Sequence, residues 1–415
     1  MASCALLHWL EVDPVVRDGL IEWEKGHLAH DLPVIFWADG TAWSEANLWA
    51  RHQTAFRDPK TVQRNMDHLC AYAKWLEVER LAWWHFPVLE RDRCLTRFRG
   101  YLVSARDDGD LAPSTVSQRM AAVMRFYRWA HSIGLISPDN PMWEERQRFV
   151  PIENVIGIQR TLSVLTTSLA IPNRKAEGTL APEDGLMPVS TDQQRRILEL
   201  AVNSASLELT LLLRLGFGTG MRLGSLCDLR VQTILNAVPC PLLGSAGWFR
   251  LSIGPRARPP VSTKFDVSGT VLIVRELLDE LREYAFSVRR LKRQAQATSE
   301  HRNLLFLTRF GKPYGVKNGR AINVKMSRLR DAGRKAGIPV FREFHFHRTR
   351  ATFVSQLMRA ALSCLSVGEA VEFVREAALH RHDQTTLRYV KFVEQSKVMA
   401  ESANAFTQSF LGLKR

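Results

Sequence analysis

The sequence predicts a mainly α-helical protein with one small antiparallel β-sheet, organised as a helical N-terminal part and a larger C-terminal domain. Apolar residues recur at three- and four-residue intervals through most of the chain, which is the period of amphipathic helices. Residues 247–274 instead contain two short runs rich in β-branched and aromatic residues, which indicates paired strands. A stretch rich in Pro and Gly at residues 149–188 separates two helical blocks, so the 415 residues are expected to form at least two domains.

Residues 59–148 are expected to form a helical domain. Apolar positions within 62–76, and again within 95–102, follow the helical period. Pro113 suits the first turn of a third helix, and Gly134 suits the residue that ends it. The block is therefore predicted to be entirely helical.

The segments on either side of this block carry less information. Residues 1–58 are rich in Trp and acidic residues and suggest one or two short helices, in an N-terminal extension to which we assign no chemistry. Residues 149–188 are interpreted as an interdomain linker, because they are longer than most connections inside a domain.

The C-terminal domain, residues 189–415, is expected to begin with a helix at Ser190, which has the spacing of a capping box with Gln193. A mostly apolar run leads from there into a glycine-rich turn that ends at Arg222. The other elements predicted are strands at 248–253 and 270–274 and helices at 350–365, 367–378 and 383–393.

The charge of the chain favours a polyanionic partner. The formal net charge is +15 and the isoelectric point is about 9.9, which points to nucleic acid first. Residues 281–350 contain 18 Lys and Arg but only 4 Asp and Glu, so this segment carries nearly all of the excess. We expect it to contact phosphates.

Other features bound the class of protein. The six cysteines show neither a C-x-x-C spacing nor a zinc-like grouping, so free buried thiols in a reducing cytoplasm are expected. No stretch approaches the roughly 20 apolar residues that a membrane-spanning helix needs, and the apolar N-terminus lacks the basic lead of a signal peptide. We expect a cytoplasmic, nucleoid-associated protein without a membrane partner.

The glycine-rich turn Gly216-Phe217-Gly218-Thr219-Gly220-Met221-Arg222 does not fit a nucleotide site. The third glycine of a dinucleotide-binding motif would fall at Met221, and no P-loop Gly-Lys-Ser/Thr follows. No nucleotide cofactor is expected.

Two further motifs stand near the C-terminus. The first is His347-Arg348-Thr349-Arg350 at the start of a predicted helix, where His347 and Arg350 are spaced to share one side. The second runs from His380 to Tyr389, across the start of the last predicted helix. Short helices would bring the two histidines, Arg350 and the phenol near each other.

These motifs resemble those of the tyrosine recombinases, the phage-integrase family. The run from His347 to Leu357 is similar to the family's H-D-L-R-H-T-F-A-T-x-L box, and the segment from Leu379 to Tyr389 is similar to its G-H…T-T-x-x-Y ending. The register of His347 and Arg350 is preferred over that of His345 and Arg348, because only there do the following residues match.

The resemblance extends over residues 60–400. Thr219-Gly220-Met221-Arg222 resembles the family's T-G-x-R box, Lys264 stands where the family has its hairpin lysine, and residues 305–313 resemble a short strand and turn. The chain departs from the family at Ser225, where an acidic residue is usual, and at Arg348 and Ala351. The helical block is similar to the family's core-binding domain, which implies a C-shaped clamp around DNA.

What the resemblance implies is a site made of Arg222, Lys264, His347, Arg350, His380 and the nucleophile Tyr389. Ionising a tyrosine at pH 7 costs about 4 kcal/mol, so a base such as His347 is needed to assist it. Two arginines suit the charge of a pentacoordinate phosphorane, Lys264 would protonate the leaving 5′-oxygen, and His380 would donate a hydrogen bond. No metal and no cofactor are implied, and the partners would be double-stranded DNA and a tetramer of this chain, alone or with sister recombinases.

Three alternatives stay open. A type IB topoisomerase uses a similar set of residues to relax DNA without strand exchange. A DNA-binding regulator without catalytic activity is the second alternative, because Ser225 replaces the usual acidic residue. A metallonuclease that uses His380, His382 and Asp383 is the third.

Overall fold

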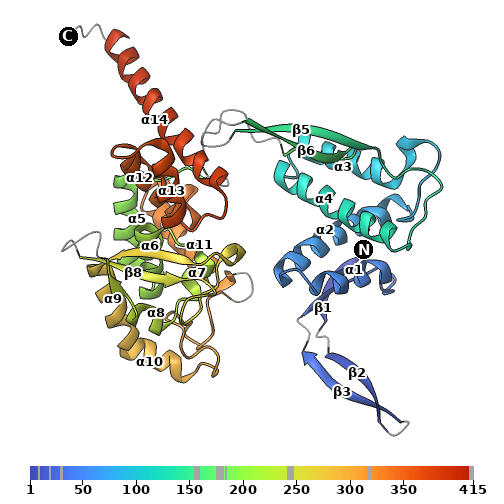
Figure 1. The fold of residues 1–415 in the computed structure, drawn as a ribbon, viewed down its shortest axis with the longest axis horizontal. Helices are drawn as coiled ribbons and strands as arrows, with labels where there is room; N and C mark the ends of the chain where they lie inside the picture. The colour runs from blue at the N-terminus through green and yellow to red at the C-terminus, as the bar shows by residue number, and fades with distance from the viewer. Residues whose placement is uncertain are drawn as a thin grey trace. The chain divides into compact units, whose positions relative to one another are not determined.

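The structure, a computed structural model, describes residues 1–7, 10–17, 20–28, 31–153, 159–173, 182, 185–240, 247–315 and 319–410. The chain divides into two compact units, Met1–Glu177 and Gly178–Arg415. Figure 1 shows both, the first in blue to green and the second in green to red. Each unit is described by itself below.

The first unit contains four α-helices and three antiparallel strand pairs among its described residues. Its helices are α1 (Ser44–Thr54), α2 (Pro59–Glu79), α3 (Cys94–Asp107) and α4 (Pro113–Ser132), with a short 3₁₀ turn at Glu90–Asp92. Its strand pairs are β1 (Ser3–Leu7) with β4 (Leu32–Phe36), β2 (Leu10–Arg17) with β3 (Leu20–Leu28), and β5 (Glu145–Glu153) with β6 (Gln159–Thr167). The three helices predicted for residues 59–148 are thus present.

Residues 1–58 contain one of the short helices predicted there, α1, but also four strands that were not predicted. Strands β1 and β4 pair across more than twenty residues of intervening chain, a contact that the local period does not reveal. Ala2, Ile35 and Trp43 are buried in the same apolar core as Phe126 of α4. The N-terminal segment is therefore an integral part of the first unit.

Part of the predicted linker also has regular structure. Strands β5 and β6 form a two-stranded ribbon, with Glu145 paired to Thr167 and Glu153 to Gln159. Residues 154–158, 174–181 and 183–184 of the linker lie outside the described residues.

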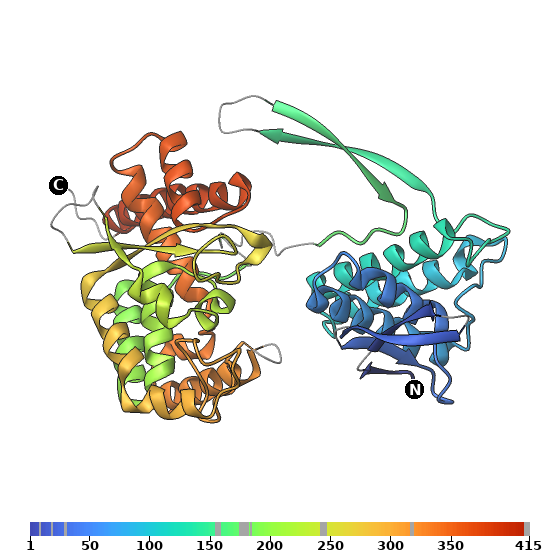
Figure 2. The same ribbon diagram turned by 60° about the horizontal axis from the view of Figure 1, so that its bottom comes forward.

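The second unit is mostly helical around a small sheet (Figure 2). Its helices are α5 (Thr191–Ser204), α6 (Leu207–Thr219), α7 (Leu223–Cys227), α8 (Val231–Leu235), α9 (Arg275–Phe286), α10 (Val288–Ala295), α11 (Arg320–Lys335), α12 (His347–Leu362), α13 (Val367–Ala377) and α14 (Asp383–Phe410). Strands β7 (Val238–Pro239), β8 (Trp248–Ile253) and β9 (Gly269–Val274) form an antiparallel sheet in that order. In Figures 1 and 2 the sheet lies between the α12–α14 helices and helices α8–α10.

Most local predictions for this unit are confirmed. The Ser190 hydroxyl accepts a hydrogen bond from the Gln193 N–H, and the Gln193 side chain accepts one from the Ser190 N–H, which is the predicted capping box. Residues 305–313 are different: instead of a strand they form a single isolated bridge, between Leu307 and Pro313. The last helix is longer than predicted, and the side chains of its residues 398–410 lie outside the described part.

The second unit contains two main apolar clusters. The larger joins α5, α6, α9, α11 and the sheet, and the smaller joins α12, α13 and the first turns of α14. Helices α6 and α12 pack closely at Gly216, where an added Cβ would lie 2.5 Å from Oγ1 of Thr349. This contact sets the N-terminal turn of α12 beside the C-terminal end of α6.

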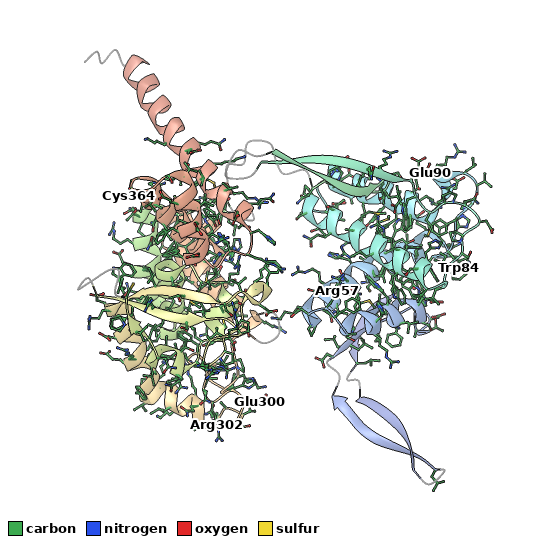
Figure 3. The ribbon with its side chains drawn as sticks, in the orientation of Figure 1. Arg57, Trp84, Glu90, Glu300, Arg302 and Cys364 are labelled. Atoms are coloured by element: carbon green, nitrogen blue, oxygen red, sulfur yellow. The ribbon has the colours of Figure 1, made fainter. Side chains whose placement is uncertain are left out.

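All six cysteines are free, as predicted, but not all are buried. Cys364 is exposed just after α12 (Figure 3), and Cys4 is half-buried. Within the described residues, no helix combines the length and the apolar character needed to cross a bilayer.

Candidate active site

The glycine-rich turn places Arg222 between two helices. Gly220 ends α6 in the left-handed conformation, with φ +64°, and Arg222 is the N-cap residue of α7. The Thr219 hydroxyl donates to the Leu215 carbonyl over 2.6 Å and accepts from the Met221 N–H over 3.3 Å. These bonds fix the turn that carries Arg222.

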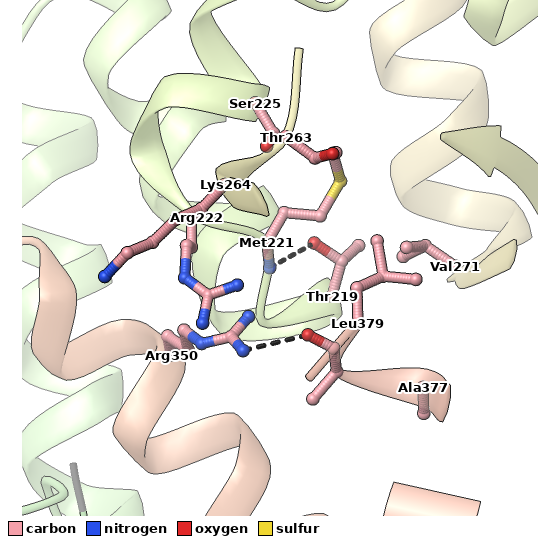
Figure 4. A pocket seen from close by; sticks show the side chains of 11 residues that line it. Thr219, Met221, Arg222, Ser225, Thr263, Lys264, Val271, Arg350, Ala377 and Leu379 are labelled. Atoms are coloured by element: carbon pink, nitrogen blue, oxygen red, sulfur yellow. Dashed lines mark hydrogen bonds between the residues drawn. The ribbon is translucent and has the colours of Figure 1, made fainter. Parts of the chain in front are cut away.

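Arg350 ties this turn to the end of α13. It is 2% exposed, in the first turn of α12. Its Nη1 donates to the Gly220 carbonyl at 2.7 Å and its Nη2 to the Ala378 carbonyl at 2.8 Å, a bond that Figure 4 shows. Arg350 therefore joins the segments before Arg222 and before His380.

A pocket opens at this junction. Its lining residues are Thr219, Met221, Arg222, Ser225, Thr263, Lys264, Val271, Arg350, Ala377, Ala378 and Leu379. Three of the six predicted site residues are among them, namely Arg222, Lys264 and Arg350, and Figure 4 shows their cationic side chains close together. Three positive charges at one pocket make a site for an anion.

His380 and Tyr389 lie together but do not line this pocket. Their rings stack with centroids 5.9 Å apart and planes 22° apart. His380 is 5% exposed, and its Nδ1 is 2.9 Å from Oγ1 of Thr386. Tyr389 is completely buried in the apolar cluster of α12–α14, beside Val354 and Val374.

His347 is the first residue of α12 and is partly exposed. It lies one helical turn before Arg350, as the motif predicts, and is not a lining residue of the pocket. The alternative pair differs, because His345 lies before the helix and is exposed, with Nδ1 3.0 Å from Nη1 of Arg330.

Leu379 turns the chain from α13 towards His380. Its φ is +53°, a rare conformation for a residue with a side chain. It packs on strand β9, where a Cβ at Gly269 would lie 2.6 Å from its Cδ2. Leu379 also lines the pocket, so the segment that carries His380 is anchored at the pocket wall.

Sequence reasoning missed two side chains near Lys264. Asp228 accepts hydrogen bonds from Ser262 in the loop that carries Lys264, and the Phe265 ring lies under the Lys264 ammonium. The only signal for them in the sequence was their position, Asp228 near the T-G-M-R box and Phe265 next to Lys264.

The basic segment 281–350 is only partly available for phosphates. Arg289 and Arg293 pair with the fully buried Glu208, with N–O distances of 2.6 and 2.8 Å. Arg290 is 3% exposed and donates to backbone carbonyls, including that of Leu304. Arg290 and Arg293 are thus largely buried, and the exposed Arg289 is engaged by Glu208, which the charge count alone did not reveal.

The described residues contain no cluster of three or more His, Cys, Asp and Glu side chains placed to hold a metal ion. His380, His382 and Asp383, the ligands of the metallonuclease alternative, therefore do not form such a group in this structure.

Comparisons with known proteins agree with the motifs. Residues 189–395 match the sequence model of the phage integrase family. No curated protein sequence is similar enough to the chain to count as a match.

The solved structures that match the chain include several integrases. The Tn1549 transposon integrase bound to circular intermediate DNA has 14% sequence identity over 83% of this chain and 93% of its own, with a TM-score of 0.48. A lambda integrase dimer bound to a COC′ core site has 15% identity over 83% and 92%, with a TM-score of 0.48. The catalytic domain of bacteriophage HP1 integrase has 20% identity over 54% and 96%, with a TM-score of 0.30.

Proposed function

Because the chain belongs to the phage integrase family, we propose that it cuts and rejoins duplex DNA through Tyr389 and the side chains around it, in the integration, excision or transposition of a mobile element. The family makes the chain a tyrosine-type site-specific DNA recombinase. One observation supports the assignment of residues best: Arg222, Lys264 and Arg350 come from separate segments of the chain and converge on one pocket.

In this proposal the two arginines bind the scissile phosphate. Arg350 lines the pocket while two of its N–H groups bond the Gly220 and Ala378 carbonyls, and in this proposal its planar guanidinium binds a phosphate oxygen there. Arg222, on the other side of the turn, would donate to the second non-bridging oxygen. Each charge-assisted hydrogen bond contributes about 1.5–3 kcal/mol, and more of it is realised as charge accumulates on the phosphorane.

The protons move in two places. As the Tyr389 oxygen forms its bond to phosphorus, His347 accepts the phenolic proton, and His380 donates a hydrogen bond to the phosphate. The bond from phosphorus to the 5′-oxygen breaks, and Lys264 gives that oxygen a proton. The products are a 3′-phosphotyrosyl link and a free 5′-hydroxyl, and a 5′-hydroxyl from another strand reverses the step. One phosphodiester replaces another, so no ATP is consumed.

Tyr389 must change its surroundings before it can attack. Its side chain is completely buried beside His380, so a DNA phosphate cannot contact the phenol in this arrangement. We propose that DNA binding shifts the first turns of α14 relative to α12 and α13. The cleavage-competent form would then be populated only on DNA, which would protect the cell from unpaired breaks.

The assembly and the domain roles are proposals as well. Residues 59–148 would be a DNA-binding domain, with residues 149–188 as its linker to the catalytic domain, residues 189–415. We propose a tetramer on two DNA sites, of this chain alone or with sister recombinases; a lambda integrase tetramer is known bound to a Holliday junction. The protein would act in the cytoplasm, on the nucleoid.

A covalent trap tests the proposal. The protein is incubated in EDTA with nicked duplexes from its own genomic neighbourhood, and adducts are separated on a denaturing gel, with Tyr389→Phe as control. An adduct formed by wild type and absent from the variant supports the proposal. If no adduct appears on any DNA that the protein binds, the regulator alternative replaces it; if a monomer relaxes supercoils without joining two sites, the topoisomerase alternative does.

A further inference from the structure

Lys264 needs help to act as a general acid. It is exposed and lies in the loop between β8 and β9, within the 3₁₀ turn Lys264–Asp266. A lysine side chain has four flexible bonds, and its ammonium is strongly hydrated. Unless the loop and the side chain are held, the ammonium spends little time at the place where the leaving oxygen needs its proton.

The base of this loop is anchored to the helix that follows Arg222. Asp228 caps the C-terminus of α7, and its Oδ2 accepts from the Ser262 N–H at 2.6 Å and from the Ser262 hydroxyl at 2.7 Å. Arg230 contributes to the same junction by donating its Nε–H to the Pro260 carbonyl at 3.2 Å. Ser262 stands two residues before Lys264, so the carboxylate fixes the register of the lysine relative to Arg222.

The tip of the loop is held differently. Phe265 and Asp266 have φ values of +67° and +54°, so two consecutive residues with side chains adopt the left-handed conformation. Such strain persists only where surrounding structure maintains it, and it is concentrated at functional sites. Here the Thr263 hydroxyl closes the turn by donating to the Val267 carbonyl at 2.7 Å.

This turn brings the Phe265 ring close to two cations. Nζ of Lys264 lies 5.1 Å from the ring centroid, and Cζ of Arg381 lies 5.6 Å from it. Arg381 directly follows His380, so the ring connects the lysine loop with the segment that carries His380. A cation over an aromatic face is attracted by the quadrupole of the ring, which restricts where the ammonium rests.

From these contacts we infer that Asp228 and Phe265 are positioning residues for Lys264: Asp228 sets the loop relative to Arg222, and the Phe265 ring holds the ammonium beside the leaving 5′-oxygen. This rests on the proposed function of Lys264 as the general acid. Ser225 stands where the family usually has an acidic residue, and Asp228, three residues later, is hydrogen-bonded to the loop that carries Lys264.

The test uses a leaving group that needs no proton. Cleavage is measured in single-turnover reactions on a nicked duplex with the natural 5′-oxygen at the scissile phosphate and on a matched duplex with a bridging 5′-sulfur. A thiol has a pKa of about 8.5, so a thiolate leaves unassisted, whereas an alkoxide does not. A residue that acts only through general-acid catalysis affects the oxygen substrate alone.

Lys264→Ala removes the general acid. It should lower the cleavage rate of the oxygen substrate by about 10²–10⁴-fold and that of the sulfur substrate very little. Asp228→Asn and Phe265→Leu should each lower the cleavage rate of the oxygen substrate by about 10-fold or more and leave that of the sulfur substrate unchanged. Phe265→Tyr keeps an aromatic ring at this position, so its cleavage rates should equal those of wild type. Combining Asp228→Asn with Lys264→Ala should add nothing to the effect of Lys264→Ala. The matched control is Asp266→Asn, which changes a neighbouring carboxylate in the same loop and tolerates the left-handed backbone.

The outcomes separate the two claims. In one outcome, Lys264→Ala cleaves the sulfur substrate at the wild-type rate, but Asp228→Asn and Phe265→Leu lower the cleavage rates of both substrates equally or of neither. The positioning inference is then overturned, and Lys264 remains the general acid. If Lys264→Ala slows both substrates equally, the proposed role of Lys264 fails, and the inference fails with it.

Discussion

The glycine of the T-G-M-R box provides a quantitative test of how the site is held together. Gly220 has φ +64°, and an added Cβ would lie 2.3 Å from Cδ1 and 3.0 Å from Cε1 of Phe353. Alanine in the left-handed region costs about 1–2 kcal/mol, and the overlap with a packed ring costs about 1–3 kcal/mol more. Gly220→Ala should therefore destabilise the second unit by roughly 2–5 kcal/mol.

The same substitution should impair cleavage, because the Gly220 carbonyl accepts a hydrogen bond from Arg350 and the next residue but one is Arg222. A misplacement of about 1 Å in a catalytic group can cost about 10²-fold in rate. The covalent trap measures this loss on DNA, at a temperature where the variant is folded.

The control for backbone strain is Gly337→Ala. Gly337 has φ +68° and no atom within 4 Å of its added Cβ, so only the left-handed cost of about 1–2 kcal/mol applies and cleavage should be normal. Stability is measured by hydrogen exchange of α6 and α12 peptides across a urea series. Equal losses of stability in Gly220→Ala and Gly337→Ala would refute the argument that the Phe353 ring occupies the space of the alanine methyl group at position 220.

Three more predictions follow from individual contacts. Arg350→Lys should lose cleavage by at least about 10²-fold in the covalent trap, since an ammonium cannot hold both carbonyls and a phosphate in one plane; wild-type activity would contradict the bridging role of Arg350. Ser190→Ala should cost about 1 kcal/mol by removing the capping box, measured by urea unfolding against Ser204→Ala at the other end of the same helix; equal costs would contradict the cap. Glu208→Gln should cost about 3–5 kcal/mol near pH 7, because it leaves Arg289 and Arg293 beside a buried neutral group, and a cost within experimental error would contradict this. Burial alone would raise the pKa of Glu208, but the hydrogen bond from Arg289 and the charge of Arg293 outweigh it and lower the pKa below its ordinary value. The contribution of this group is therefore complete above a pH of about 4.3, where the unfolded carboxyl titrates, and is lost as the pH falls through the folded pKa. Urea unfolding at a series of pH values should show a larger loss of stability at low pH in wild type than in Glu208→Gln.

Much of the second unit was predictable from local sequence. Helix starts such as the Ser190 capping box and the helical period of α12 and α13 depend on residues within one or two turns, so the sequence shows them directly. The strands β8 and β9 are close in the chain and strongly apolar, and they were predicted for the same reason. The family was indicated by the order of the motif residues along the chain, which is Arg222, Lys264, His347-x-x-Arg350, His380 and Tyr389.

The sequence by itself thus determined the helical class, the family and the candidate side chains, because each depends on residues that are near each other in the chain or on a fixed order of motifs. Only the tertiary structure decided which of those side chains share a pocket. Arg350 bonds to the Gly220 carbonyl across 130 residues, β1 pairs with β4 in the first unit, and Arg289 and Arg293 turn inward to Glu208. The burial of Tyr389 is likewise a feature that only the tertiary structure shows. Such contacts depend on how distant segments pack, and neither local propensity nor periodicity contains that information.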